Sequence, residues 1–251
     1  MNKLARAIAE KRFLLGTVVT SPSTALAEAL SNTSIDWLCF DMEHSTLDIA
    51  TVQSMVQAMN PKCMSFIRIE EPAAVFVKRA LDTGCDGVVI PQVNSVEIAA
   101  AMVVAGKFPP LGSRSIGLGR ALGYGSRLVE KLGTANDDSA IIVQIEHRDA
   151  VAQAAEIASC PGVDAVFVGP YDLSGSLGKP GNIGDEQVQT AIDQALAAAR
   201  QKGKPAGIFV GSEDAARKEI ARGFTFIAVG ADVLRLTSSV QATVSAIRGG
   251  S

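Results

Sequence analysis

Short apolar runs recur along the chain, and each is followed by a polar turn and then by an alanine-rich stretch of helical character. The eight runs often contain β-branched residues. Their apolar residues are mostly consecutive and do not alternate with polar ones, which is typical of strands in a parallel sheet covered on both faces. The predicted strands span residues 14–19, 37–41, 65–69, 87–91, 141–146, 165–169, 206–210 and 224–229. The helices predicted between them span residues 46–59, 72–83, 95–106, 148–159, 185–201 and 212–222.

Eight strands that alternate with helices in 251 residues match the count of a (β/α)8 barrel. The predicted fold is therefore α/β, a single (β/α)8 TIM barrel, with an open doubly wound sheet as the alternative, because the sequence does not show whether the sheet closes. No low-complexity linker divides the chain, which predicts one domain over residues 1–251. Residues 107–139, with the motif KFPPLGSRSIGLGRALGYG, interrupt the rhythm. We expect them to form a long βα loop insertion at the active-site face of the barrel.

Composition and charge exclude several classes of protein. The chain is 47% hydrophobic and 20% charged, and its net charge of −3 without a basic run argues against a nucleic-acid partner. Residues 1–12 predict an amphipathic first helix and no signal peptide, and no apolar run is long enough to span a membrane. The four cysteines are scattered without a C-x-x-C pair, which favours buried free thiols. A cytoplasmic protein in a reducing compartment is expected.

Ionisable side chains stand where several predicted strands end. Asp41 ends the second strand, with His44 in the loop beyond it, and Arg68 lies near the end of the third strand. Glu146 ends the fifth strand and Asp172 follows the sixth. In a (β/α)8 barrel the functional groups lie at the carboxyl ends of the strands and in the loops that follow. These five side chains are therefore expected to meet on one rim.

Glu146 and Asp172 offer carboxylate oxygens from neighbouring strands, which favours Mg²⁺ or Mn²⁺ over Zn²⁺ as the bound ion. Strand alternation turns Gln144 to the same side as Glu146, where it is expected to hydrogen-bond the site. Ser174 lies where a short helix could open and receive an anion on its free N–H groups; the alternative is a Pro/Gly turn with Asp172 as helix cap. His147 follows Glu146 directly and is expected to point out of the barrel.

The sequence resembles the HpcH/HpaI aldolase family over roughly residues 5–245. The motifs that carry the resemblance are FDMEHS, IRIEEPAAVFVKRALDTGCDGVVIPQV, KFPPLGSRSIGLGRALGYG, VQIEHRDAV and VFVGPYDLSGSLGKPG. The resemblance implies a (β/α)8 barrel that reversibly cleaves a 4-hydroxy-2-keto acid to pyruvate, or a related 2-keto acid, and an aldehyde through a metal-stabilised enolate. Members commonly assemble as hexamers, so a homo-oligomer is implied as well.

The resemblance also implies roles for individual residues. Glu146 and Asp172 would bind the divalent metal, with Mg²⁺ or Mn²⁺ favoured and Co²⁺ as a further option. His44 would serve in acid/base catalysis, with Asp41 orienting it or a metal-bound water. Arg68 would hold the pyruvyl oxygen and stabilise the enolate.

The expected substrate contacts leave the aldehyde open. Tyr171 stands where better-known members have a small residue, which would narrow the pocket, and GLGRALGYG differs from the arginine-rich loop of members that act on diacids. Arg114 and Arg120 in the insertion are candidates for contacts with a distal anionic group, or for surface or subunit contacts. The residues expected at the substrate are Arg68, Gln144, Tyr171, Asp172 and Ser174.

Two other functions remain open at this point. One is a lyase on acyl-CoA substrates, as in the related citrate lyase β subunits, and the other is a catalytically silent barrel that acts as a binding or assembly subunit. A Schiff-base mechanism is disfavoured, because none of the ten lysines lies within a predicted strand.

Overall fold

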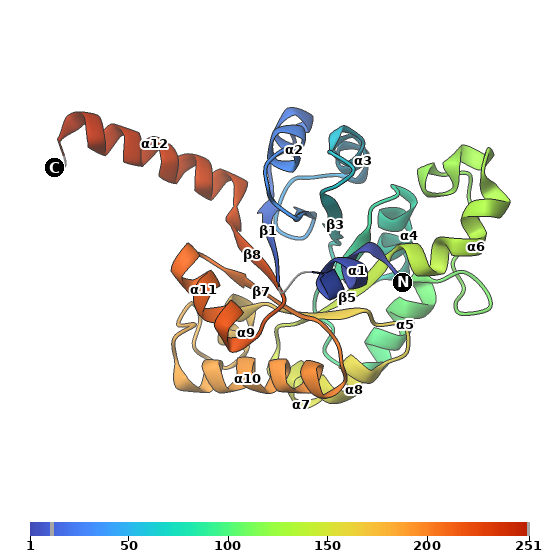
Figure 1. Ribbon diagram of the computed structural model, residues 1–251. Helices are drawn as coiled ribbons and strands as arrows, with labels where there is room; N and C mark the ends of the chain where they lie inside the picture. The colour runs from blue at the N-terminus through green and yellow to red at the C-terminus, as the bar shows by residue number, and fades with distance from the viewer. Residues whose placement is uncertain (11–12, 250–251) are drawn as a thin grey trace.

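The computed structural model describes residues 1–10 and 13–249, and its eight parallel strands close into a barrel in chain order (Figure 1). The predicted (β/α)8 barrel is confirmed, and the alternative of an open sheet is wrong, because β1 pairs with β8 as well as with β2. The strands are β1 (Leu14–Val19), β2 (Trp37–Asp41), β3 (Met64–Arg68), β4 (Gly87–Ile90), β5 (Ala140–Ile145), β6 (Ala165–Val168), β7 (Ala206–Val210) and β8 (Phe226–Ala231).

Helices connect the strands. The helix predicted over residues 148–159 is two helices in the structure, and the predicted first helix is confirmed as far as the described residues extend. The helices are α1 (Lys3–Glu10), α2 (Thr24–Ser31), α3 (Ile49–Ala58), α4 (Ala74–Asp82), α5 (Val96–Gly106), α6 (Leu128–Asp138), α7 (Arg148–Ala152), α8 (Ala154–Ser159), α9 (Pro170–Ser176), α10 (Glu186–Gln201), α11 (Glu213–Arg222) and α12 (Asp232–Arg248), with a 3-10 segment η1 (Arg120–Gly125).

Side-chain caps determine where several helices begin. Ser95, Asp185 and Ser212 each accept a hydrogen bond from a backbone N–H two or three residues further along the chain. Such caps satisfy N–H groups that have no partner inside the helix. The helices predicted from residues 95, 185 and 212 therefore begin one residue later, with the predicted first residue as the cap.

Aromatic side chains fill the barrel interior below the C-terminal ends of the strands. The ring centroid of Trp37 lies 5.6 Å from that of Phe66, 6.3 Å from Phe167 and 6.0 Å from Phe226. Gly16 pairs with Trp37 across β1 and β2, and a Cβ on Gly16 would lie 2.1 Å from the indole ring. Glycine at this position makes room for the indole, and the aromatic cluster forms the floor of the cavity described below.

The insertion at residues 107–139 lies at the other end of the barrel from the one expected. It follows α5 and precedes β5, so it connects a helix to the next strand. Arg114 Nη2 lies 2.6 Å from Asp82 Oδ1, and Arg120 Nη1 donates to the Thr83 carbonyl at 2.7 Å. Asp82 and Thr83 stand at the end of α4, and the helices of such a barrel end where the strands begin. The expected position at the active-site face is wrong, and neither arginine lines the cavity at that face.

The last helix, α12, leaves the barrel and does not pack along it (Figure 1). Asp232 is its one buried residue, and the apolar side chains of Val233, Leu236, Val240 and Ile247 are exposed. Their spacing of three, four and seven residues places them on one face of the helix. In a single chain this apolar face is uncovered.

Two expectations from composition can be compared with the structure. The four cysteines are free and buried, as predicted. Within the part of the chain that the structure describes, none of the helices combines the length and the apolar character needed to cross a membrane.

Candidate active site

A cavity of about 300 Å³ opens at the C-terminal ends of the strands. Glu146, which is only 1% exposed, lies directly beside it, because its carboxylate accepts a hydrogen bond from the amide of the lining residue Gln144. The structure therefore brings seven of the eight predicted site residues to one rim. The six that line the cavity are Asp41, His44, Arg68, Gln144, Tyr171 and Asp172.

Asp41 and Arg68 form a bidentate ion pair at the ends of β2 and β3, which are in register there. Arg68 Nε lies 2.9 Å from Asp41 Oδ1, and Arg68 Nη2 lies 2.7 Å from Oδ2. Two parallel hydrogen bonds from a planar guanidinium to a buried carboxylate fix the direction of the arginine. Asp41 Oδ1 also accepts the backbone N–H groups of Glu43 and His44, at 3.1 and 3.2 Å, and so shapes the loop after β2.

These contacts differ from the role that the resemblance implied for Asp41. Among the interactions of the described residues, none joins the Asp41 carboxylate to the imidazole of His44. The carboxylate beside the imidazole is that of Glu43, whose Oε2 lies 3.6 Å from His44 Nε2 and 3.3 Å from Arg68 Nη1. The His44 side chain is 58% exposed. Asp41 therefore positions Arg68 and the loop backbone, and Glu43 faces the histidine ring.

The Glu43 carboxyl lies in surroundings that favour its neutral form. The pKa of Glu43 is raised to about 7, mainly by burial; the negative charges of Asp41 and Asp172 contribute to this rise, and the positive charge of Arg68 opposes it. Glu43 Oε2 is buried and, among the residues that the structure describes, has no hydrogen-bond partner. A carboxyl of this kind changes protonation state near neutral pH, as groups that take part in proton transfer do.

Glu146 is held from three directions. Its Oε1 accepts the backbone N–H of Gln92 at 2.7 Å, and its Oε2 accepts the side-chain amide of Gln144. A Cβ on Gly169 would lie 2.6 Å from Glu146 Oε2 and 2.9 Å from Gln144 Nε2, so glycine is required to leave the carboxylate in place. The predicted pairing of Gln144 with Glu146 is confirmed.

The surroundings of Glu146 fit a divalent cation. The pKa of Glu146 is raised to about 7, mainly by burial and also by the charges of Glu43 and Asp172, while the Gln92 N–H opposes the rise. The three carboxylates therefore repel one another. Gln144 Oε1 is buried without a partner in the described part of the chain. A cation would relieve this repulsion, and carboxylate oxygens are the ligands that Mg²⁺ and Mn²⁺ prefer.

The number of protein ligands would be small. Within residues 1–10 and 13–249, no group of three or more His, Cys, Asp or Glu side chains is arranged to hold a metal ion. The pair Glu146 and Asp172 would therefore supply two ligands and leave the other positions to water and substrate, which is the arrangement of an open, catalytic metal site.

Ser174 is the predicted site residue that the structure places elsewhere. Helix α9 begins at Pro170 with Gly169 as its N-cap, so neither a helix opening at Leu173 nor a cap by Asp172 is observed. The Ser174 hydroxyl is fully buried, donates to the Tyr171 carbonyl at 2.6 Å and accepts the Gly181 N–H at 3.0 Å. Its contacts are internal to the fold, and it does not line the cavity.

His147 behaves as predicted from strand alternation. Its Nδ1 accepts the backbone N–H of Asp149 at 3.2 Å and so caps α7, outside the cavity. A structural role for this histidine is confirmed.

Three residues of the site were not assigned a role from the sequence. Glu43 lies within FDMEHS beside His44, so the motif itself contained the signal. Gln92 contributes a backbone N–H, which no side-chain pattern indicates. Phe209 on β7 lines the cavity, but in the sequence it is one apolar residue in an apolar strand.

Residues 15–239 match the family described as HpcH/HpaI aldolase/citrate lyase. A hydroxypyruvate/pyruvate aldolase of Chromohalobacter salexigens is 38% identical over 226 residues, 89% of each chain. A 4-hydroxy-2-oxo-heptane-1,7-dioate aldolase of Escherichia coli is 34% identical over 244 residues, 96% of this chain and 93% of the relative. The crystal structure of an HpcH/HpaI aldolase/citrate lyase family protein from Burkholderia cenocepacia superposes with a TM-score of 0.94 at 36% identity, covering 99% of this chain and 100% of that one.

The family match extends over all eight strands and over the rim residues at their ends. The chain therefore belongs to the HpcH/HpaI aldolase/citrate lyase family and is a carbon–carbon lyase of that family.

Proposed function

We propose that this chain is a divalent-metal-dependent aldolase that reversibly cleaves a 4-hydroxy-2-keto acid to pyruvate, or a related 2-keto acid, and an aldehyde. The observation that carries the proposal is the rim, where Glu43, Glu146 and Asp172 repel one another beside a guanidinium, Arg68, held by Asp41. The names of the relatives from Chromohalobacter salexigens and Escherichia coli support a keto-acid substrate.

Glu146 and Asp172 would hold the cation, which when bound supplies Lewis-acid chemistry at the keto acid. Arg68 presents a fixed positive charge to the cavity, where it can offset the negative charge that develops on the keto oxygen during cleavage. Because Asp41 binds two nitrogens of the guanidinium, Arg68 keeps its direction before substrate enters. Such preorganisation avoids a reorganisation cost at the moment of reaction.

Cleavage also requires a group that takes the proton from the 4-hydroxyl. We assign this step to His44, since an imidazole accepts and returns protons at neutral pH and this one lines the cavity. Glu43 Oε2, 3.6 Å from His44 Nε2, would orient the ring and share the proton. In that role Glu43 replaces Asp41.

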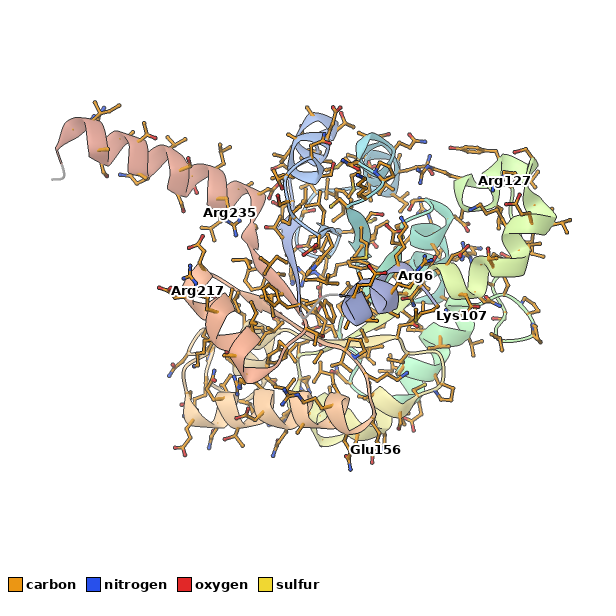
Figure 2. The ribbon with its side chains drawn as sticks, in the orientation of Figure 1. Arg6, Lys107, Arg127, Glu156, Arg217 and Arg235 are labelled. Carbon is orange, nitrogen blue, oxygen red and sulfur yellow. The ribbon has the colours of Figure 1, made fainter. Side chains whose placement is uncertain are left out.

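The positions of the lysines support a metal-dependent mechanism over a Schiff base. Among the residues that the structure describes, no lysine lines the cavity. Lys107 is buried, but it donates to the Asn136 and Ser139 carbonyls and lies on the side of the molecule that carries the insertion (Figure 2). A Schiff base needs a desolvated lysine that reaches the substrate.

Release of pyruvate from 4-hydroxy-2-oxo acids, coupled to lactate dehydrogenase and NADH, tests the proposal. We expect turnover that needs Mg²⁺ or Mn²⁺, stops with EDTA and falls by about 100-fold or more in Glu146→Gln. Asp149→Asn removes an exposed carboxylate outside the cavity and should retain activity.

Two results would contradict the proposal. Turnover of an acyl-CoA substrate without pyruvate release would favour a citrate-lyase-like function. Stoichiometric metal binding without turnover of either substrate class would favour a silent barrel.

We also propose that the protein is a homo-oligomer, a hexamer by family resemblance. The exposed apolar face of α12 supports this, because such a face is stabilised when another surface covers it. The buried free thiols support the expected cytoplasmic location.

A further inference from the structure

The charged side chains of the cavity lie on one part of the barrel circumference, whereas apolar side chains line it all round. Its charged and amide side chains come from β2 and the loop after it, from β3, from β5 and from α9. The strands β7, β8 and β1, which are neighbours in the closed barrel, contribute no charged side chain to it. We define the apolar arc as the side chains of Val18, Tyr171, Phe209, Phe226, Ala228 and Ala231, all of which line the cavity.

Tyr171 and Phe209 form the outer wall of this arc. Their ring centroids lie 6.1 Å apart in an edge-to-face arrangement, at an interplanar angle of 61°. Tyr171 is 48% exposed and directly precedes the proposed metal ligand Asp172. Tyr171, Phe209 and Asp172 line the same cavity, so a keto acid held at Asp172 would have the two aromatic rings in its surroundings.

A threonine hydroxyl that borders this arc is already engaged. Thr20, at the end of β1, donates its hydroxyl to Asp232 Oδ1 at 2.8 Å. It therefore has no hydroxyl hydrogen to offer a ligand.

Among the residues that the structure describes, no free cation serves the apolar arc. In the part of the chain that the structure describes, Arg68 is the one lysine or arginine in the cavity lining, and its nitrogens face Asp41 and Glu43. Arg235 stands at the base of α12 (Figure 2), outside the lining, and donates to the Val229 carbonyl at 2.9 Å. A carboxylate on the apolar arc would meet apolar groups, the Tyr171 hydroxyl and neighbouring carboxylates, but no cation among the described residues.

We infer that the aldehyde partner is uncharged with an apolar chain, and that Tyr171 and Phe209 select it. The inference rests on the proposed function. In the aldol direction the methyl carbon of pyruvate loses a proton to the base and bonds to the aldehyde carbon, while the aldehyde oxygen gains a proton. The aldehyde substituent is unchanged, and the apolar arc houses it. An alkyl chain gains by leaving water there, whereas a terminal carboxylate loses hydration without gaining a cation.

The test compares two acceptors of equal length, butanal and succinic semialdehyde, each with pyruvate and Mg²⁺. Butanal ends in a methyl group, and succinic semialdehyde ends in a carboxylate. We expect kcat/KM to be at least about tenfold higher for butanal, because the carboxylate would be desolvated without a cation to pair with. A preference for succinic semialdehyde would overturn the inference, and it is the result expected if a second copy of the chain supplied a cation.

Variants test whether Tyr171 determines which aldehyde is accepted. Tyr171→Arg should shift the kcat/KM ratio toward succinic semialdehyde by about fivefold or more, since it adds a cation to the wall. Tyr171→Leu keeps the wall apolar and should retain the preference for butanal. Gln194→Arg adds the same charge on the exposed side of α10 and should leave the ratio unchanged. An unchanged ratio in Tyr171→Arg would contradict the role of Tyr171.

Exchange of the pyruvate methyl protons in D₂O, measured on the unmodified protein, separates the two proposals. Exchange with a preference for the charged acceptor overturns the inference alone. Absence of both exchange and aldol addition overturns the proposed function, and the inference with it.

Discussion

At the scale of single residues, Glu146 shows which contacts a sequence can predict. Its place at the end of a strand and its alternation with Gln144 predicted its direction and its amide partner, and the structure confirms both. The N–H of Gln92 was not predictable, because every residue except proline carries that group. The backbone of Gln92 has a φ of 51°, a conformation that residues other than glycine rarely adopt.

Metal affinity should depend on pH through Glu146. Its pKa is raised to about 7, so below this pH the carboxyl is protonated and the proton competes with the cation. Affinity for Mn²⁺ should therefore fall by up to about tenfold per pH unit below 7 and level off above it. Electron paramagnetic resonance of free Mn²⁺ in titrations at several pH values checks this. An affinity that stays constant as the pH falls would contradict the assignment of Glu146 as a ligand.

Gly169→Ala should displace the Glu146 carboxylate, because the new Cβ would lie 2.6 Å from Oε2. We expect Mn²⁺ affinity to fall by about tenfold or more, as it does when a partner that orients a metal ligand is lost. Titration calorimetry measures the change. Gly175→Ala is the matched control, because nothing lies within 4 Å of a Cβ there and alanine favours the helix. Equal affinities in the two variants would contradict the account.

At the scale of elements, periodicity predicted the strands well and placed the insertion wrongly. Ser95, Asp185 and Ser212 are residues whose side chains cap helices, so the helix starts were close to the observed ones. The helix predicted over 95–106 already occupies the connection that leaves β4. Residues 107–139 therefore had to lie after that helix, at the end of the barrel where strands begin.

Arg114→Ala tests that position. Arg114 is 4% exposed, pairs with Asp82 and lies 4.5 Å from the Phe108 ring, so its loss should lower the free energy of unfolding by about 1–3 kcal/mol. Chemical denaturation measures the loss, and the KM for the keto acid should not change. Arg127→Ala removes an exposed pair with Glu130 and should have no measurable effect. A raised KM in Arg114→Ala would indicate that the insertion contributes to the active site, which would contradict its position at the other end of the barrel.

At the scale of the whole molecule, the sequence alone does not establish that the barrel closes or where α12 lies. Strand patterns indicate burial on both faces but do not say whether the first strand meets the last. The spacing of Val233, Leu236, Val240 and Ile247 gives α12 one apolar face, which supports the proposed oligomer. The sequence does not indicate which surface would cover that face.

The exposed face of α12 makes a prediction about assembly. The protein should have a mass in solution that is a multiple of 26.1 kDa, and Leu236→Glu with Val240→Glu should shift it toward the single chain. Light scattering after size exclusion measures both. Ala242→Glu with Ser245→Glu changes the opposite face and should keep the assembly, since successive residues are about 100° apart on a helix and both positions lie far from the apolar face. A mass of one chain for the unmodified protein would contradict this prediction.

The most direct test of the central claim is the exchange of pyruvate methyl protons in D₂O, followed by NMR with Mg²⁺ and then with excess EDTA. It requires no knowledge of the aldehyde. We predict exchange that depends on Mg²⁺ and is lost in Glu146→Ala, because the carboxylate rim would hold the cation that assists removal of the methyl proton. Mg²⁺ bound without any exchange would contradict a pyruvate aldolase.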